Sequence, residues 1–260
     1  MSEPGTLAGR VCVLAGGSGG IGGTLARALH AEGAPLVIGY RRARERAEAL
    51  AADLRAAGAA AVATVGGDLS EEATRDALLA AARGLGDPYG LVVLAGDPAR
   101  PLDAVATQAE IESSLRDNYV GPMLLARSFS TACARGAGGG AIVLFSTMQG
   151  VALFEGSLGY ASPKAALIHG ARLLAKEVGG PADVRVNVVA PGVTAAGMAE
   201  ASIRSGKYDR FVSGGAIRRF GRPEDVVRAV RFFLEPDGYV TGQVLTVDGG
   251  LTLRRDVLGR

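Results

Sequence analysis

Tryptophan is absent from the 260-residue chain, and aromatic residues make up only 5% of it. Cysteine and histidine are also scarce, with two residues of each type. Cys12 and Cys133 fall in apolar stretches, so we expect two buried thiols and no disulfide. Two isolated histidines are too few for a metal cluster, so no metal is predicted.

An excess of one charge sign is missing too, because 28 basic residues face 26 acidic ones and the net charge is +2. Such a balance does not predict a surface for nucleic acid. No apolar run reaches the length that crosses a bilayer, and residues 1–9 do not resemble a signal peptide. We therefore expect a cytoplasmic protein with neither nucleic acid nor membrane as a partner.

Apolar runs alternate with helical patterns along the chain. The runs predict seven strands, over residues 10–15, 35–40, 60–65, 91–95, 141–146, 184–189 and 243–247. The main helical patterns cover residues 41–57, 70–83, 108–135 with a kink at Gly121-Pro122, 158–178 and 224–234. This order predicts one α/β domain over residues 1–260. We expect a doubly wound Rossmann-type fold with a seven-stranded parallel sheet and helices on both faces.

One segment, residues 195–219, breaks this rhythm with glycine-bearing turns and mixed polarity. Long excursions at the carboxyl edge of such a sheet often cover a substrate, so we expect a lid there. A surface loop without a role in binding is the alternative.

The first strand runs into a glycine-rich turn, GGSGGIGG over residues 16–23, and a helical pattern follows. Glycines permit the tight turn and let backbone N–H groups approach a pyrophosphate, to which the helix N-terminus adds positive partial charge. The alternative is a flexible loop. The expected cofactor contacts in this turn are Gly16, Ser18, Gly19, Gly20, Ile21 and Gly22.

Tyr160 and Lys164 are four residues apart, which places both side chains on one face of a helix. An ammonium next to a phenol favours phenolate and lowers the phenol pKa. The pair can therefore exchange a proton with a carbonyl or alcohol oxygen. The pattern also occurs by chance on surface helices, so it gains weight only from the motifs around it.

Further motifs stand in a fixed order along the chain. They are Asp68-Leu69 after the third strand, Asn118 in the long helical region, Asn187 to Gly192, Arg219 to Val226, Thr241 to Gln243 and Val247 to Gly250. With the glycine turn and the Tyr160/Lys164 pair, they make the chain resemble the short-chain dehydrogenase/reductase family over nearly its whole length. Within that family the chain most resembles the ketoreductases.

The resemblance implies roles for these residues. Tyr160 would be the general acid and base, Lys164 would lower its pKa and bind the nicotinamide ribose, and Asn118 would hold a water near Lys164. Asp68 and Leu69 would lie against adenine, and Ala95 and Gly96 would leave room for the cofactor. The turn that lines the nicotinamide would be Pro191, Gly192, Val193 and Thr194.

Three departures from the family pattern affect these expectations. Val93-Leu94 stands where the family has an Asn pair, so two side-chain hydrogen-bonding groups are lost. Thr147 stands where the family has its catalytic Ser, with Ser146 adjacent, and either hydroxyl is a candidate donor to the substrate carbonyl. Ala196 replaces a Thr that commonly follows the Pro-Gly pair.

The end of the second strand predicts NADP(H) in preference to NAD(H). NAD-binding folds commonly end this strand with an acid that binds the ribose 2′-OH. Here Arg41 and Arg42 follow Tyr40, and no acid occurs before Glu45. Guanidinium groups favour a 2′-phosphate. The alternative is that both arginines open a solvated helix, and Gly19 lacks the basic side chain common at that position in NADP enzymes.

The expected activity is reduction of a ketone or aldehyde, or the reverse oxidation. Leu153, Phe154, Met198 and Phe211 are candidates for an apolar substrate pocket, and no charged residue stands out as a clamp for an anion. Two other functions stay open: non-redox chemistry on a bound cofactor, such as epimerisation or dehydration, and nucleotide binding without catalysis. By resemblance we expect a homotetramer, with a dimer as the alternative.

Overall fold

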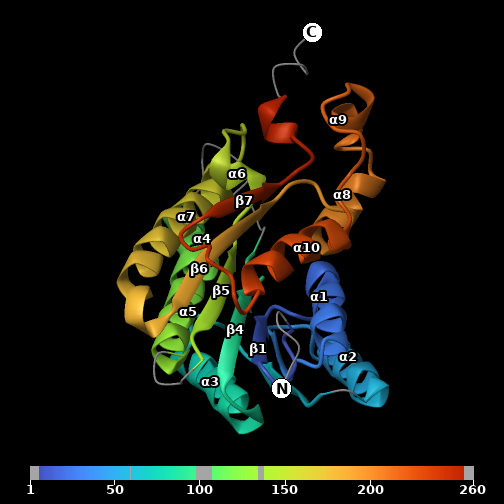
Figure 1. Ribbon diagram of the computed structural model, residues 1–260. Coiled ribbons are helices and arrows are strands. Elements are labelled where there is room, and N and C mark those ends of the chain that lie inside the picture. Colours follow the sequence, from blue (N-terminus) through green and yellow to red (C-terminus); the bar gives the residue numbers. More distant parts are fainter. Residues whose placement is uncertain (1–5, 59, 98–106, 134–137, 255–260) are drawn as a thin grey trace.

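The computed structural model describes residues 6–58, 60–97, 107–133 and 138–254. Within them, seven parallel strands form one sheet in the order β3-β2-β1-β4-β5-β6-β7 (Figure 1). The strands are β1 (Val11–Ala15), β2 (Leu36–Tyr40), β3 (Val62–Gly66), β4 (Pro88–Val93), β5 (Gly140–Phe145), β6 (Val184–Pro191) and β7 (Val244–Val247).

Helices cover both faces of this sheet. The long ones are α1 (Gly20–Ala31), α2 (Arg44–Ala57), α3 (Glu72–Leu85), α4 (Gln108–Leu115), α5 (Gly121–Cys133), α7 (Leu158–Val178) and α10 (Pro223–Leu234). Shorter helices are the π-helical η1 (Arg116–Val120), α6 (Met148–Val151), α8 (Glu200–Arg204) and α9 (Asp209–Ser213). The 3₁₀ turns are η2 (Gly180–Ala182), η3 (Gly197–Ala199) and η4 (Leu251–Leu253).

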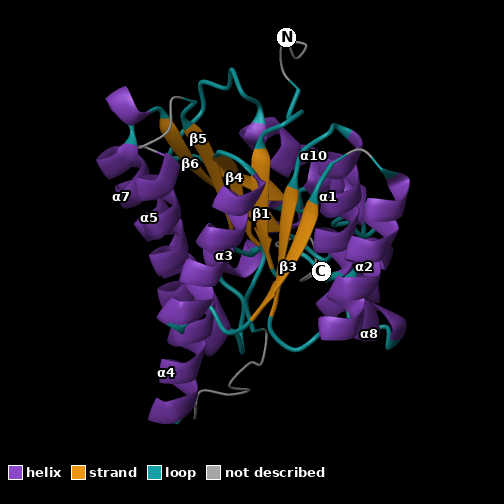
Figure 2. Ribbon diagram, turned by 90° about the horizontal axis from the view of Figure 1, so that it is seen from below, coloured by secondary structure: helices purple, strands orange, loops and turns teal. Residues whose placement is uncertain are grey.

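Successive side chains along each strand point to opposite faces of the sheet, so the core consists of two layers. In β1, Cys12 and Leu14 pack with helices α1, α2 and α10, whereas Val11 and Val13 pack with helices α3, α5 and α7. Figure 2 shows these two sets of helices on opposite sides of the sheet. Burial of both faces explains why the strands are continuous apolar runs. The expected fold class is confirmed.

Strand β1 lies between β2 and β4, so the chain reverses its direction of winding at β1 and β4. Ligands of open α/β sheets bind at the carboxyl ends of the strands at such a switch point. The turn after β1 is the glycine-rich one, and backbone N–H groups of Leu94 and Ala95 after β4 both donate to Ala15 O, at 2.9 and 3.0 Å.

The long helical region departs from the sequence prediction. We expected one helix over residues 108–135 with a kink at Gly121-Pro122, whereas η1 separates α4 from α5 just before that pair. A proline inside a helix removes an N–H and crowds the carbonyl four residues earlier. The wider π turn accommodates Pro122 there, and such turns often occur at functional sites.

The chain also forms a third, smaller apolar cluster outside the two core layers. Met148, Val193, Phe211, Ala216, Ile217 and Leu251 are its buried members. It packs α9 and the residues after it against the end of β6, so the segment expected to be a lid is anchored by burial. Among the described residues, no helix has both the length and the apolar character needed to cross a membrane.

Candidate functional site

A cavity of about 1120 Å³ opens at the carboxyl ends of the strands. Ala15 of β1, Tyr40 of β2, Phe145 of β5 and Pro191 of β6 all line it. Most residues expected at the site also line it, and these are Gly16, Ser18, Gly19, Gly20, Ile21, Gly22, Arg41, Asp68, Leu69, Ala95, Gly96, Thr147, Tyr160, Lys164, Pro191, Gly192, Val193 and Thr194. Asn118 and Arg42 do not line it.

The glycine turn fits an anionic group. Gly16 has φ +86°, and a Cβ there would lie 2.8 Å from Ala95 N, so only glycine brings the turn this close to β4. Helix α1 begins without a side-chain cap and without an acidic residue in its first turn. Its N-terminal partial positive charge is therefore not offset by a local carboxylate and faces the cavity. A pyrophosphate is the ligand that this geometry suits.

Residues 196 and 197 lie close to the glycine-rich turn. A Cβ at Gly20 would lie 2.8 Å from Gly197 N and 3.0 Å from the Ala196 side chain. Thr194 is 3% exposed, and its hydroxyl donates to Gly192 O at 3.3 Å. The segment after β6 therefore reaches across the cavity to the start of α1.

Helix α7 carries Tyr160 and Lys164 on the side that faces the cavity, where their side chains are 8% and 2% exposed. The Lys164 ammonium donates to Phe145 O at 2.9 Å. Burial lowers the pKa of Lys164 to about 8, because a charge is costly away from water. A Cβ at Gly96 would lie 2.9 Å from Lys164 Nζ and 2.8 Å from Asn118 Oδ1, so a larger residue there would displace these two polar groups.

The two adjacent hydroxyl groups after β5 differ in what they contact. Ser146 is 5% exposed, and its hydroxyl donates to Lys164 O at 3.0 Å. Thr147 caps α6, and its Oγ1 accepts from Gln149 N at 3.4 Å. Among the described residues no acceptor takes the Thr147 proton, so that hydroxyl can donate into the cavity.

Asn118 lies fully buried in η1, behind the cavity wall. Its amide donates to Asp97 O at 3.0 Å and to Ser114 Oγ at 3.2 Å, and its Oδ1 accepts from Asp97 N at 3.1 Å. The Ser114 hydroxyl in turn donates to Gly159 O. Pro163 lacks the N–H that would otherwise bond that carbonyl within α7. A hydrogen-bond chain thus joins Asn118 to the helix of Tyr160.

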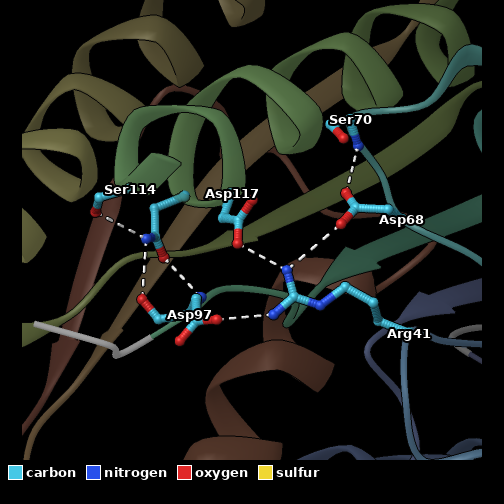
Figure 3. A network of polar contacts seen from close by, with 7 residues as sticks. Arg41, Asp68, Ser70, Asp97, Ser114 and Asp117 are labelled. Carbon is cyan, nitrogen blue, oxygen red and sulfur yellow. Dashed lines mark hydrogen bonds and ion pairs between the residues drawn. The ribbon is translucent and has the colours of Figure 1, made fainter. Parts of the chain in front are cut away.

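Arg41 makes contacts that the sequence did not predict. Its guanidinium lies 2.7 Å from Asp117, 2.8 Å from Asp97 and 3.5 Å from Asp68 (Figure 3). Arg41, Asp68 and Asp97 follow the ends of β2, β3 and β4, and Asp117 belongs to η1. The hydrogen bonds to Asp117 and Asp97 raise the pKa of Arg41, and the one to Asp117 has the largest effect. Burial alone would raise the pKa of Asp68, but the Ser70 N–H and the Arg41 charge outweigh it and lower that pKa.

Sequence reasoning missed several residues that line the cavity. Arg46 of α2 and Arg116 of η1 line the cavity, and Lys207 and Arg210 line it from the segment expected to be a lid. Phe154 and Phe211 line the cavity as expected, whereas Leu153 is 88% exposed and does not. The Met198 side chain lies outside the described residues. For Lys207 and Arg210, the signal available in the sequence was that each directly precedes an aromatic residue, Tyr208 and Phe211.

The sequence model of a family described as enoyl-(acyl carrier protein) reductase matches residues 15–252. The 3-oxoacyl-(acyl-carrier-protein) reductase of Rattus norvegicus is 34% identical over 245 residues, covering 94% of this chain and 98% of the relative. NADPH-dependent aldehyde reductase 2, chloroplastic, of Arabidopsis thaliana is 30% identical over 266 residues, covering 97% of both. A short-chain type dehydrogenase/reductase from Mycobacterium ulcerans superposes with a TM-score of 0.88 at 27% identity, covering 95% of this chain and 91% of that one.

Proposed function

The chain belongs to the short-chain dehydrogenase/reductase family of oxidoreductases, and from that premise we propose that it reduces a ketone or aldehyde to an alcohol, with Tyr160 as the proton donor. The observation that carries this proposal is the meeting of three groups in one cavity. Tyr160, Lys164 and the Thr147 hydroxyl all line it, next to a glycine turn that suits a pyrophosphate.

Each residue has a physical task in this proposal. The glycine turn and the N-terminus of α1 would hold the pyrophosphate of a nicotinamide dinucleotide, and the bound nicotinamide supplies the hydride. Thr147 donates a hydrogen bond to the substrate oxygen and stabilises the charge that develops there. Tyr160 gives its proton to that oxygen, and the Lys164 ammonium favours the phenolate left behind.

Asn118 acts as a positioning residue, because its side chain is fully buried and does not line the cavity. Its hydrogen bonds hold residue 97 and, through Ser114, the start of α7. Thr147 is favoured over Ser146 as the donor to the substrate because the Ser146 proton is already used on Lys164 O.

We also propose that NADPH is preferred over NADH. The absence of an acid at the end of β2 and the guanidinium group of Arg46 at the cavity support this. Arg41 also lines the cavity, but its guanidinium is already paired with Asp68, Asp97 and Asp117. Arg42 does not contribute to the support, since it does not line the cavity. The name of the Arabidopsis relative includes NADPH dependence, which agrees with the proposal.

A homotetramer is the assembly we propose. Val120, Leu124 and Leu173 expose apolar surface on η1, α5 and α7, by 40, 40 and 50%. Phe232 of α10 and Leu245 of β7 do so at a second place, by 53 and 37%. Two separate apolar faces suit two kinds of subunit contact. A monomeric mass in light scattering would contradict this assembly.

The first test is the substitution Tyr160→Phe. We expect NADPH binding, followed by cofactor fluorescence, to stay within about twofold of wild type, since the phenol oxygen is not needed to hold the pyrophosphate. Turnover of ketones should fall at least a hundredfold, the lower range of general acid catalysis. Thr147→Val should reduce turnover while Thr147→Ser keeps it. Retained turnover in Tyr160→Phe would refute the assigned role, and turnover products without net cofactor oxidation would favour non-redox chemistry.

A further inference from the structure

The lid side of the cavity carries two cations that the proposed reaction does not use. Lys207 precedes α9 and Arg210 lies within it, and both are exposed and line the cavity. Lys207 Nζ lies 5.8 Å from the centre of the Tyr208 ring, and the Arg210 guanidinium carbon lies 5.3 Å from that of Phe211. The two rings stack at 5.9 Å. Cation–π contact thus holds both charges over one apolar wall.

Neither cation is neutralised by a neighbouring acid. Within the part of the chain that the structure describes, the cations in ion pairs are Arg27, Arg41, Arg219, Arg228 and Arg231. Neither Lys207 nor Arg210 lies within ion-pair distance of a carboxylate there. Asp209 stands between them in the sequence but does not line the cavity. Glu155, from the loop before α7, is the one carboxylate among the described residues lining this side.

The apolar wall connects these cations to the catalytic groups. Met148, next to Thr147, and Phe211, next to Arg210, belong to the same buried cluster, and Phe154 and Tyr208 pack against it. A molecule whose carbonyl meets Thr147 and Tyr160 can therefore run along apolar surface to the two cations. We propose that the substrate carries an oxyanion, a carboxylate or a phosphate, which Lys207 and Arg210 bind, with an apolar stretch between it and the carbonyl.

This inference rests on the proposed reduction, so its test uses probes that share the keto group and the carbon chain and differ in the group at the far end, which is an anion or neutral. They are a medium-chain oxo acid, its methyl ester, and the phosphate monoester of the matching keto alcohol. With NADPH as reductant, wild type should show kcat/KM about tenfold higher for either anion than for the ester, because two partly exposed ion pairs each contribute about threefold. Raised salt should reduce this preference.

Substitutions then assign the preference to the two cations. Lys207→Met and Arg210→Met should each lower kcat/KM for the anions about threefold, leave the ester unchanged, and together abolish the preference. Arg204→Met is the matched control, since Arg204 is exposed on the neighbouring α8 and does not line the cavity. Glu155→Gln should strengthen the preference, because it removes a repelling charge. A larger loss for the phosphate or for the carboxylate identifies which oxyanion the site takes.

The outcomes separate this inference from the proposed reaction. Reduction of the ester and the anions with equal efficiency, or a preference that survives in the double variant, overturns the anion site and leaves the reductase intact. If no probe is reduced, calorimetry on the NADPH-loaded protein decides. Tighter binding of the anions that disappears in the double variant supports the site, and equal or undetectable binding overturns it.

Discussion

The guanidinium of Arg41 lies within 4 Å of Asp68, Asp97 and Asp117, so carboxylates outnumber the cation three to one. A 2′-phosphate brought to Arg41 must compete with these acids and is repelled by them. Arg46 lines the same side of the cavity, and among the described residues it has no ion-pair partner. The free guanidinium is therefore the better phosphate ligand.

At the residue scale, this predicts an order among three neighbouring arginines. Arg46→Ala should weaken NADPH binding about tenfold and leave NADH unchanged, as expected for one hydrogen bond to a charged group. Arg41→Ala should weaken both cofactors, because three carboxylates lose their shared cation. Arg42→Ala is the control and should change neither. Titration by cofactor fluorescence measures all three, and a loss confined to Arg42→Ala would contradict the order.

The sequence located Arg41 correctly at the end of the second strand, because position relative to a strand can be read from local pattern. It could not predict the partners Asp97 and Asp117, which are 56 and 76 positions away and meet Arg41 only through the strand order. Thr147 and Ser146 show the same limit. Both were candidate donors, and only the position of Lys164 O distinguishes the two hydroxyls.

At the scale of elements, Pro163 organises the contact between α7 and α4. Its missing N–H leaves Gly159 O without the usual partner in the helix, and the Ser114 hydroxyl from α4 fills that role. Ser114 then accepts from Asn118 of η1. One proline thus lets a neighbouring helix hydrogen-bond directly to the first turn of the helix that carries Tyr160.

The prediction at this scale is a coupling between Ser114 and Pro163. Ser114→Ala should lower the free energy of unfolding by about 2 kcal/mol, because a buried carbonyl and a buried amide lose partners. In a Pro163→Ala background the restored N–H can bond Gly159 O, so the same substitution should cost about 1 kcal/mol less. Urea unfolding of the four proteins measures this. Equal costs in both backgrounds would mean that Ser114 does not replace the missing N–H.

In the helical region formed by α4, η1 and α5, the position of an irregularity was predicted from the sequence, but its form was not. Gly121-Pro122 indicated an irregularity, and one lies there, because proline restricts the backbone wherever it occurs. The form of the irregularity, the π turn Arg116–Val120, was not predicted, since it lies where α4, α5 and α7 meet. The apolar strands were found near their observed positions because burial on both faces leaves a continuous signal.

At the scale of the whole molecule, catalysis and stability make opposite demands on Lys164. The proposed reaction needs its charge, yet Lys164 is 2% exposed, and burial lowers its pKa from 10.5 to about 8. Between about pH 8 and 10.5 the unfolded chain binds more protons than the folded one, so this group makes stability rise with pH there. Below that window it destabilises the fold by up to ~3 kcal/mol.

Lys164→Met should therefore stabilise the protein without cofactor at neutral pH. The expected gain is about 2 kcal/mol, because the lost hydrogen bond to Phe145 O offsets part of the relief. The gain should shrink as pH rises above about 8 and vanish near about 10. The thiols of Cys12 and Cys133, whose pKa values burial raises to about 12, make stability fall with rising pH above about 9. They do so in both proteins, so they cancel in the difference.

Urea unfolding of wild type, Lys164→Met and the control Lys176→Met at several pH values measures this difference. Lys176 lies exposed on the same helix, so its substitution should leave stability unchanged at every pH. A gain in stability together with lost turnover would mean that the buried charge is kept for function at the expense of the fold. A difference between Lys164→Met and wild type that does not vary with pH would mean that Lys164 is not the group whose titration is displaced by burial.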